Sequence, residues 1–275
     1  MSYQSPDLTG IDYFPCQYGN SKLIFRGPKR RIQDEFVAYL GGIETFGKFI
    51  EMPFPMLTEV ETGMRSVNLG CVNSGVDAYI NDKSLIDICS QAKVTVIQLS
   101  GAQNMSNRFY AVHPRRNDRV VRVSSLLRTI YDEVEFTEFN FTGHLLGTLA
   151  KASPEKFTMV ENELRNAWVA RMRSLIEQIG GKVVLLWMSD HSPDHKADGQ
   201  HGRSEPLFID RGMINSLAAD VEAKLEIVGQ PQEIERGYDE MIFGQMEQPA
   251  AAEMLGPVVH RRTAQELAET LQKFV

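Results

Sequence analysis

Short apolar runs that end in glycine or in a polar turn alternate along the chain with segments of helical periodicity. Runs of this kind, rich in β-branched and aromatic residues, are typical of buried parallel strands. Apolar residues repeated at intervals of three and four between capping residues predict amphipathic helices. We expect strands in the ranges 36–42, 65–70, 94–101, 182–190 and 225–229. We expect helices in the ranges 53–63, 82–92, 153–179, 208–217 and 260–273.

This alternating order predicts an α/β fold, because consecutive parallel strands need helical crossovers that cover both faces of a sheet. The prediction is a three-layer α/β/α sandwich with a central, mainly parallel five-stranded sheet, of the flavodoxin-like kind. The whole chain, residues 1–275, is expected to form a single domain. It has an N-terminal extension (1–34) and a long insertion after the third strand (102–150), where the aromatic-rich passage 134–146 does not distinguish strand from helix.

The composition is that of an ordinary globular protein, with 43% hydrophobic and 24% charged residues. No apolar run reaches the roughly 18 residues that a membrane-spanning helix needs, so we expect no membrane association. The first residues, MSYQSPDLTGIDYF, have neither the basic nor the apolar region of a secretory signal, which favours a cytoplasmic location.

The net charge and the cysteine content limit which partners, cofactors and metals we expect this protein to bind. The net charge of −7 disfavours binding to nucleic acid, since no overall positive field attracts phosphates. Cys16, Cys71 and Cys89 are too widely spaced for a disulfide framework or a structural zinc site, so we expect free thiols, no cofactor and no resident metal. Two basic runs stand out, at 25–31 and 113–119, and the first is interpreted as a solvated lead-in to the first strand. The oligomeric state stays open.

In a parallel α/β sheet, ligands bind at the carboxyl ends of the strands. The loops of interest therefore follow Leu40, Leu69, Leu99 and Met188, together with the segment before the last helix.

The run 40–47, LGGIETFG, resembles the L-G-D-S-x-T-x-G opening of the SGNH (GDSL-type) hydrolases. In this resemblance Gly42 stands at the aspartate position and Ile43 at the position of the nucleophilic serine. The run 257–260, PVVH, resembles the closing D-x-x-H block, with Pro257 at the aspartate and His260 at the catalytic histidine. Acyl transfer by a triad needs a hydroxyl, an imidazole and an orienting carboxylate, so serine-esterase activity is not expected.

The same resemblance implies which residues line the cleft. Asn68 and Gly70 match the N-x-G turn of the family, and SGAQN at 100–104 resembles its G-x-N-D block, with either Gln103 or Asn104 as the oxyanion asparagine. Gly42 completes this pocket.

Two residues just after the lost serine offer other chemistry. Glu44, beside Thr45, could act as the base for a water molecule or could cap the following turn. Ser100 could supply a hydroxyl, although a serine at the end of a buried strand is more typical of a turn.

The run HPRRNDR suggests an anion site, because the guanidinium fork binds phosphate, sulfate or carboxylate through two hydrogen bonds. Its candidate members are Arg108, His113, Arg115, Arg116 and Arg119. The alternative is an ion network with Asp118, Asp132 and Glu133. HPRRNDR and G-x-E-T-[FY]-G also resemble motifs of a bacterial family of unknown function.

A third candidate is a loop rich in aspartate and histidine, whose side chains suit a divalent metal. It comprises Asp190, His191, Asp194, His195, Asp198 and His201. We favour a solvated loop, because no helix or strand fixes a ligand spacing.

Taken together, the sequence predicts an SGNH-like protein that binds an anionic or carbohydrate-derived small molecule in the cleft, with hydrolase or transferase activity possible. The alternative is a catalytically inactive scaffold that serves as a binding or interaction module.

Overall fold

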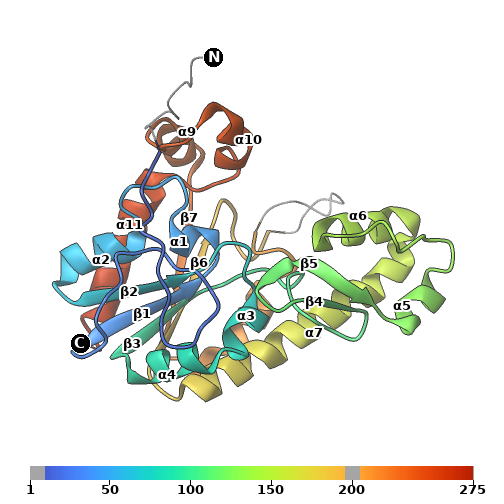
Figure 1. Cartoon of the computed structure of the whole chain (residues 1–275), viewed down its shortest axis with the longest axis horizontal. Coiled ribbons are helices and arrows are strands. Elements are labelled where there is room, and N and C mark those ends of the chain that lie inside the picture. Colours follow the sequence, from blue (N-terminus) through green and yellow to red (C-terminus); the bar gives the residue numbers. More distant parts are fainter. Residues whose placement is uncertain (1–9, 196–204, 275) are drawn as a thin grey trace, which may run out of the picture.

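The computed structural model describes residues 10–195 and 205–274 and contains one parallel sheet between two layers of helices (Figure 1). The strand order is β2-β1-β3-β6-β7, and every neighbouring pair is parallel. The predicted three-layer α/β/α sandwich is confirmed. Its strands are β1 (Phe36–Gly41), β2 (Arg65–Gly70), β3 (Val94–Gln98), β6 (Val183–Ser189) and β7 (Ala223–Val228).

Successive side chains of the strands enter two separate apolar layers, as the period of two requires. Val37 and Tyr39 of β1 face the layer of α2 (Phe54–Thr62) and α11 (Pro257–Leu271). The intervening β1 residues face the opposite layer, formed by α3 (Val76–Ile80), α4 (Lys83–Gln91) and α7 (Pro154–Ile179). Because both faces are covered, the strands are apolar throughout, which explains why they could be predicted.

Local capping explains where the helices begin and end. The Ser153 side chain accepts a hydrogen bond from Lys156 N at the start of α7, and Gly180 ends this helix in the left-handed conformation (φ 63°). The last helix begins at Pro257, three residues before its predicted start, because proline suits the first turn. The predicted helix 208–217 is shorter, with α8 at Arg211–Asn215 followed by the 3₁₀ turn η1 (Ala218–Asp220).

The insertion after β3 forms an antiparallel hairpin and two helices, which extend from one end of the sandwich (Figure 1). The hairpin pairs β4 (Tyr110–His113) with β5 (Arg116–Val123). Four of the eight residues of β5 are charged, and all but Asn117 are exposed or half-buried, so the alternation that would predict a strand is absent. The helices are α5 (Ser125–Ile130) and α6 (Thr142–Ala152).

A small C-terminal cover lies near the carboxyl end of β1. It consists of α9 (Pro231–Asp239), η2 (Gln245–Glu247) and α10 (Gln248–Ala251), none of which was predicted. Its Met241, Ala251 and Met254 form an apolar cluster with Phe49 and Ile50, and Ile43 packs against this cluster. We call this group the cover cluster.

The N-terminal extension corrects one interpretation of the basic run 25–31. Arg26 is only 5% exposed rather than solvated. Its guanidinium donates hydrogen bonds to the main-chain oxygens of Gly47, Ile50 and Glu51 at 2.6, 2.7 and 2.6 Å. Burial lowers the pKa of Arg26. This buried cation therefore fixes the loop that follows α1 (Ile43–Phe46).

Two further findings concern the cysteine thiols and the apolar character of the helices. Cys16, Cys71 and Cys89 are free thiols, as predicted. In the part of the chain that the structure describes, no helix combines the length and apolar character needed to cross a bilayer.

Candidate functional site

The strand order places the topological switch point between β1 and β3, where open α/β sheets bind ligands. Gly41 ends β1 at this point, and a Cβ atom on it would lie 2.1 Å from Thr45 Oγ1 and 2.6 Å from Gln98 Oε1. The absence of a side chain therefore lets α1 fold back against the end of β3.

Several polar groups predicted for the cleft are bonded to one another or to Gln98, which the sequence analysis did not single out. Gln98 Oε1 accepts hydrogen bonds from Gly42 N at 3.1 Å and from Thr45 Oγ1 at 2.9 Å. Asn68 Oδ1 accepts from Gly70 N at 2.8 Å, and Asn68 Nδ2 donates to the main-chain oxygen of Thr45 at 2.7 Å. Gly42 N, Gly70 N, Thr45 Oγ1 and Asn68 Nδ2 thus already have partners at the switch point.

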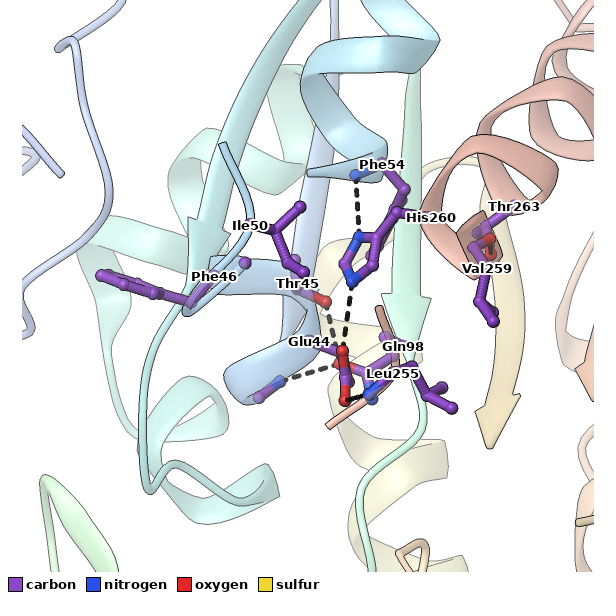
Figure 2. A network of polar contacts seen from close by, with 12 residues as sticks. Glu44, Thr45, Phe46, Ile50, Phe54, Gln98, Leu255, Val259, His260 and Thr263 are labelled. Carbon is purple, nitrogen blue, oxygen red and sulfur yellow. Dashed lines mark hydrogen bonds and ion pairs between the residues drawn. The ribbon is translucent and has the colours of Figure 1, made fainter. Parts of the chain in front are cut away.

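Glu44 and His260 meet behind this loop, although 216 positions separate them in the sequence (Figure 2). Glu44 Oε2 lies 3.2 Å from His260 Nε2, and Glu44 Oε1 accepts a hydrogen bond from Leu255 N at 3.0 Å. Phe54 N donates to His260 Nδ1 at 3.1 Å. The His260 side chain is 0% exposed.

These contacts decide the state of the imidazole. Nδ1 accepts the amide proton of Phe54, so in the neutral ring the remaining proton is on Nε2, directed at Glu44. A general base needs one ring nitrogen free for its substrate. In this arrangement neither nitrogen of His260 is free to accept a proton from a substrate, and the catalytic role expected for His260 and Glu44 stays a prediction. Their contacts join α1, α2 and α11.

The residues at the two triad positions of the sequence resemblance also make structural contacts. Ile43, at the serine position of the resemblance, packs against the cover cluster. Pro257, at the aspartate position, is the first residue of α11 and has helical backbone geometry suited to proline.

The two candidates for the oxyanion position lie in different surroundings. Asn104 Oδ1 accepts a hydrogen bond from Thr142 Oγ1 of α6 at 2.7 Å, and the Asn104 main chain lies against Gly75. Gln103 instead donates through Nε2 to Glu205 Oε1. Gln103 thus contacts Glu205, whereas Asn104 contacts α6.

The carboxylate of Glu205 rests on three N–H donors, which we call the N–H cradle. Gly101 N and Leu207 N donate to its Oε2 at 3.2 and 3.4 Å, and Gln103 Nε2 contacts its Oε1. Burial raises the pKa of Glu205 although these hydrogen bonds lower it. Ser100 contributes its main-chain oxygen, which accepts from Trp168 Nε1 at 2.9 Å.

The residues predicted to form an anion site make separate contacts. Arg108 pairs with Glu163 at 2.6 Å, Arg116 with Asp118 at 3.7 Å, and Arg119 stacks over the Phe141 ring at 5.1 Å. His113 Nδ1 accepts from Arg115 N and Arg116 N in the hairpin turn at 3.2 and 3.3 Å. Of the predicted ion network, the Arg116–Asp118 pair forms, whereas Glu133 pairs with Lys156.

Of these residues, Arg115 lines a groove that has a volume of about 680 Å³. The groove lies between the N-terminal extension, the start of α4 and the hairpin turn. Lys22, Lys83 and Arg115 have no carboxylate within 4.0 Å among residues 10–195 and 205–274. The groove also contains the polar residues Asn20, Asn81, Asp82, Ser84 and Asp87.

Sequence reasoning missed Lys22 and Lys83 because each is a single lysine without a motif. Only the approach of the extension to α4 reveals them, through Asn20 N, which donates to Ser84 Oγ at 3.1 Å.

The loop rich in aspartate and histidine is described in part, since Asp198 and His201 lie outside the described residues. Within those that are described, no group of three or more His, Cys, Asp or Glu residues could hold a metal ion. Asp194 pairs with Arg211 at 2.7 Å, and His191 lies 2.7 Å from Asp190.

Fold and site together define an α/β/α sandwich of flavodoxin-like strand order, in which polar groups near the switch point are bonded to one another. The chain belongs to the DUF6473 family, a domain of unknown function whose model matches residues 1–275. Among curated proteins, no sequence matches the chain.

Three solved structures are similar to the chain. A gut microbial diltiazem-metabolizing enzyme has a TM-score of 0.40 and 10% identity over 89% of this chain and 47% of its own. The YxiM protein from Bacillus subtilis has a TM-score of 0.39 and 13% identity over 87% and 57%. The lipase Lip_vut3 from a goat rumen metagenome has a TM-score of 0.37 and 13% identity over 82% and 100%. The chain therefore spans about half the length of the first two structures.

Proposed function

We propose that this protein is an SGNH-like scaffold without serine-hydrolase activity at the inherited position, and that it binds a small anionic sugar derivative. The observation that carries this proposal is the groove in which Lys22, Lys83 and Arg115 have no carboxylate partner among the described residues. The binding site thus lies beside the sandwich and not at the switch point.

The switch point supports loss of the inherited chemistry. A serine esterase needs a hydroxyl and an imidazole nitrogen that accepts its proton. Ile43 provides no hydroxyl, and His260 is 0% exposed with Nδ1 held by Phe54 N. The residues that would surround a substrate there are bonded to one another.

The groove supports an anionic ligand with hydroxyl groups. Its three cations can bind a phosphate or carboxylate, and Arg115 can do so through two parallel hydrogen bonds. Asp82 and Asp87 would repel a ligand that carried only negative charge, but their oxygens accept hydrogen bonds from hydroxyls. A sugar phosphate or sugar acid combines both features.

The test is calorimetric titration of the full chain with glucose 6-phosphate and glucuronate, with glucose and inorganic phosphate as comparison ligands. We expect binding of at least one sugar anion, weakened about tenfold by Lys83→Gln or Arg115→Gln, since each change removes one charge-assisted contact. Arg122→Gln is the matched control, because Arg122 is an exposed hairpin arginine that does not line the groove.

Equal binding of inorganic phosphate and both sugar anions would overturn the sugar part of the proposal. Absence of binding by all four ligands would overturn the ligand site itself, in favour of a scaffold that acts as an interaction module. An equal effect of Arg122→Gln and Arg115→Gln would assign the binding to general surface charge.

A further inference from the structure

The end of β6 carries a polar arrangement that the proposed binding function does not use. Ser189 is the last residue of β6, and Asp190 and His191 follow it directly. His191 Nδ1 lies 2.7 Å from Asp190 Oδ1 and 2.7 Å from Ser189 Oγ. The Trp187 indole donates to the main-chain oxygen of His191 at 2.8 Å and meets its ring edge-on at 5.5 Å. These contacts fix the position of the imidazole.

The partners of Nδ1 determine which ring nitrogen is basic. An ionised carboxylate can only accept a hydrogen bond, and the bond from His191 holds the pKa of Asp190 below its usual value. Nδ1 therefore carries the proton, and the neutral ring has its lone pair on Nε2. No described residue bonds to Nε2, and the side chain is 19% exposed. His260, in contrast, is fully buried and has both nitrogens occupied.

Ser189 is not placed as a nucleophile. Its hydroxyl donates to the main-chain oxygen of Glu205 at 2.7 Å, and the residue is 2% exposed. Since its proton is directed at Glu205 and not at an imidazole lone pair, no base activates it. Its hydroxyl instead connects His191 to Glu205, whose carboxylate lies in the N–H cradle.

The N–H cradle provides donors of the type that stabilise an oxyanion. Gly101 N, Leu207 N and Gln103 Nε2 all point at one carboxylate, that of Glu205. Gly101 is necessary for this geometry, because a Cβ on it would lie 2.6 Å from Leu207 N. Backbone N–H pairs of this kind stabilise the negative charge that develops on an acyl oxygen.

We propose that His191, positioned by Asp190, is the general base of a second, catalytic site that hydrolyses small carboxylic esters, with the acyl oxygen replacing the Glu205 carboxylate in the N–H cradle. His191 Nε2 takes a proton from water while the water oxygen forms a bond to the acyl carbon. The ester C–O bond then breaks, and the leaving oxygen takes the proton back from Nε2. An acid and an alcohol are released, and no serine or metal takes part in these steps.

The experiment is hydrolysis of p-nitrophenyl acetate by the full chain, followed through release of p-nitrophenolate. We expect His191→Gln to lower the rate at least about tenfold, which is a conservative effect for loss of a general base. His195→Gln is the matched control and should leave the rate unchanged. His195 is exposed, its ring lies 5.8 Å from that of His191, and it has no carboxylate partner among the described residues.

Asp190 is tested as a positioning residue. Asp190→Asn should lower kcat with little change in KM, and Asp190→Glu should restore part of kcat, because a longer carboxylate can still accept from Nδ1. A structural role alone would change folding, which circular dichroism of both variants measures, and would not separate the two substitutions.

A second measurement uses diethyl pyrocarbonate, whose carbonyl carbon bonds to an imidazole nitrogen with loss of ethanol and carbon dioxide. His191 should be modified faster than His195 by peptide mass spectrometry. Equal hydrolysis rates in His191→Gln and the unmodified chain would overturn the proposal, as would equal modification of the two histidines. Neither assay involves the groove, so the catalytic proposal and the sugar-binding proposal can fail independently.

Discussion

Burial raises the pKa of the Glu205 carboxyl, even though Gly101 N and Leu207 N donate hydrogen bonds to it. Desolvation therefore favours the protonated acid over the ionised carboxylate.

The raised pKa of Glu205 determines whether the free energy of unfolding rises or falls with pH. The folded state holds its proton above the unfolded pKa of about 4.3, so the folded state binds more protons between that value and the raised pKa. The free energy of unfolding therefore falls as the pH rises through this window, because the folded state disfavours the ionised Glu205 carboxylate.

We expect the substitution Glu205→Gln to remove this loss of folding stability at higher pH. The substituted protein should melt at nearly the same temperature as the unmodified chain at pH 4 and at a higher temperature at pH 7.5. Thermal unfolding followed by circular dichroism at both pH values measures the difference. A variant that loses stability relative to the unmodified chain as the pH rises would show that the ionised carboxylate is favoured at this position.

At the scale of elements, Glu44 and His260 join α1 to α11. The short helix α1 presents Glu44 to α11, and α11 presents His260 to both Glu44 and the first residue of α2. The cover cluster packs against Ile43 at the same point. The contacts that hold these elements together also occupy both ring nitrogens of His260, so neither nitrogen is free to accept a proton from a substrate.

The double substitution Ile43→Ser and Pro257→Asp restores the residue types of the triad. We expect no serine-hydrolase activity from it, because His260 Nδ1 accepts from Phe54 N and its Nε2 faces Glu44. Labelling with a fluorophosphonate probe measures the activity, with an active serine esterase as the positive control. Labelling of the double variant at position 43 that disappears on further His260→Gln substitution would contradict this interpretation.

At the scale of the whole molecule, one apolar cluster joins the sandwich to the insertion. Tyr110, Leu127 and Leu145 of the insertion belong to the same buried cluster as Leu40 of β1 and Trp168 of α7. An insertion that shares its core with the sheet is not an independent folding unit.

We therefore expect one cooperative unfolding transition for the full chain. Far-ultraviolet circular dichroism and fluorescence of Trp168 and Trp187 should give the same midpoint in urea, since both tryptophans are buried in that cluster. Two separated midpoints would show that the insertion, or the C-terminal cover, unfolds by itself.

The sequence by itself determined the sheet and the main helices. The five strands are buried on both faces and read as continuous apolar runs, and Ser153 and Gly180 mark the ends of α7 through local geometry. It also offered either Gln103 or Asn104 as an oxyanion residue, and it singled out the loop rich in aspartate and histidine, which it interpreted as solvated. The strand β5 was missed, because its largely charged, exposed face gives no alternating apolar signal.

Only the tertiary structure decided what the polar residues do. Glu44 and His260 are 216 positions apart, and Gln103 and Glu205 are 102 apart, so no local pattern could show that they meet. Lys22 and Arg115 reach one groove because the extension and the hairpin both pack beside α4. Periodicity predicts which face of an element is buried, but the pairing of charges and the freedom of an imidazole nitrogen depend on distances that only packing sets.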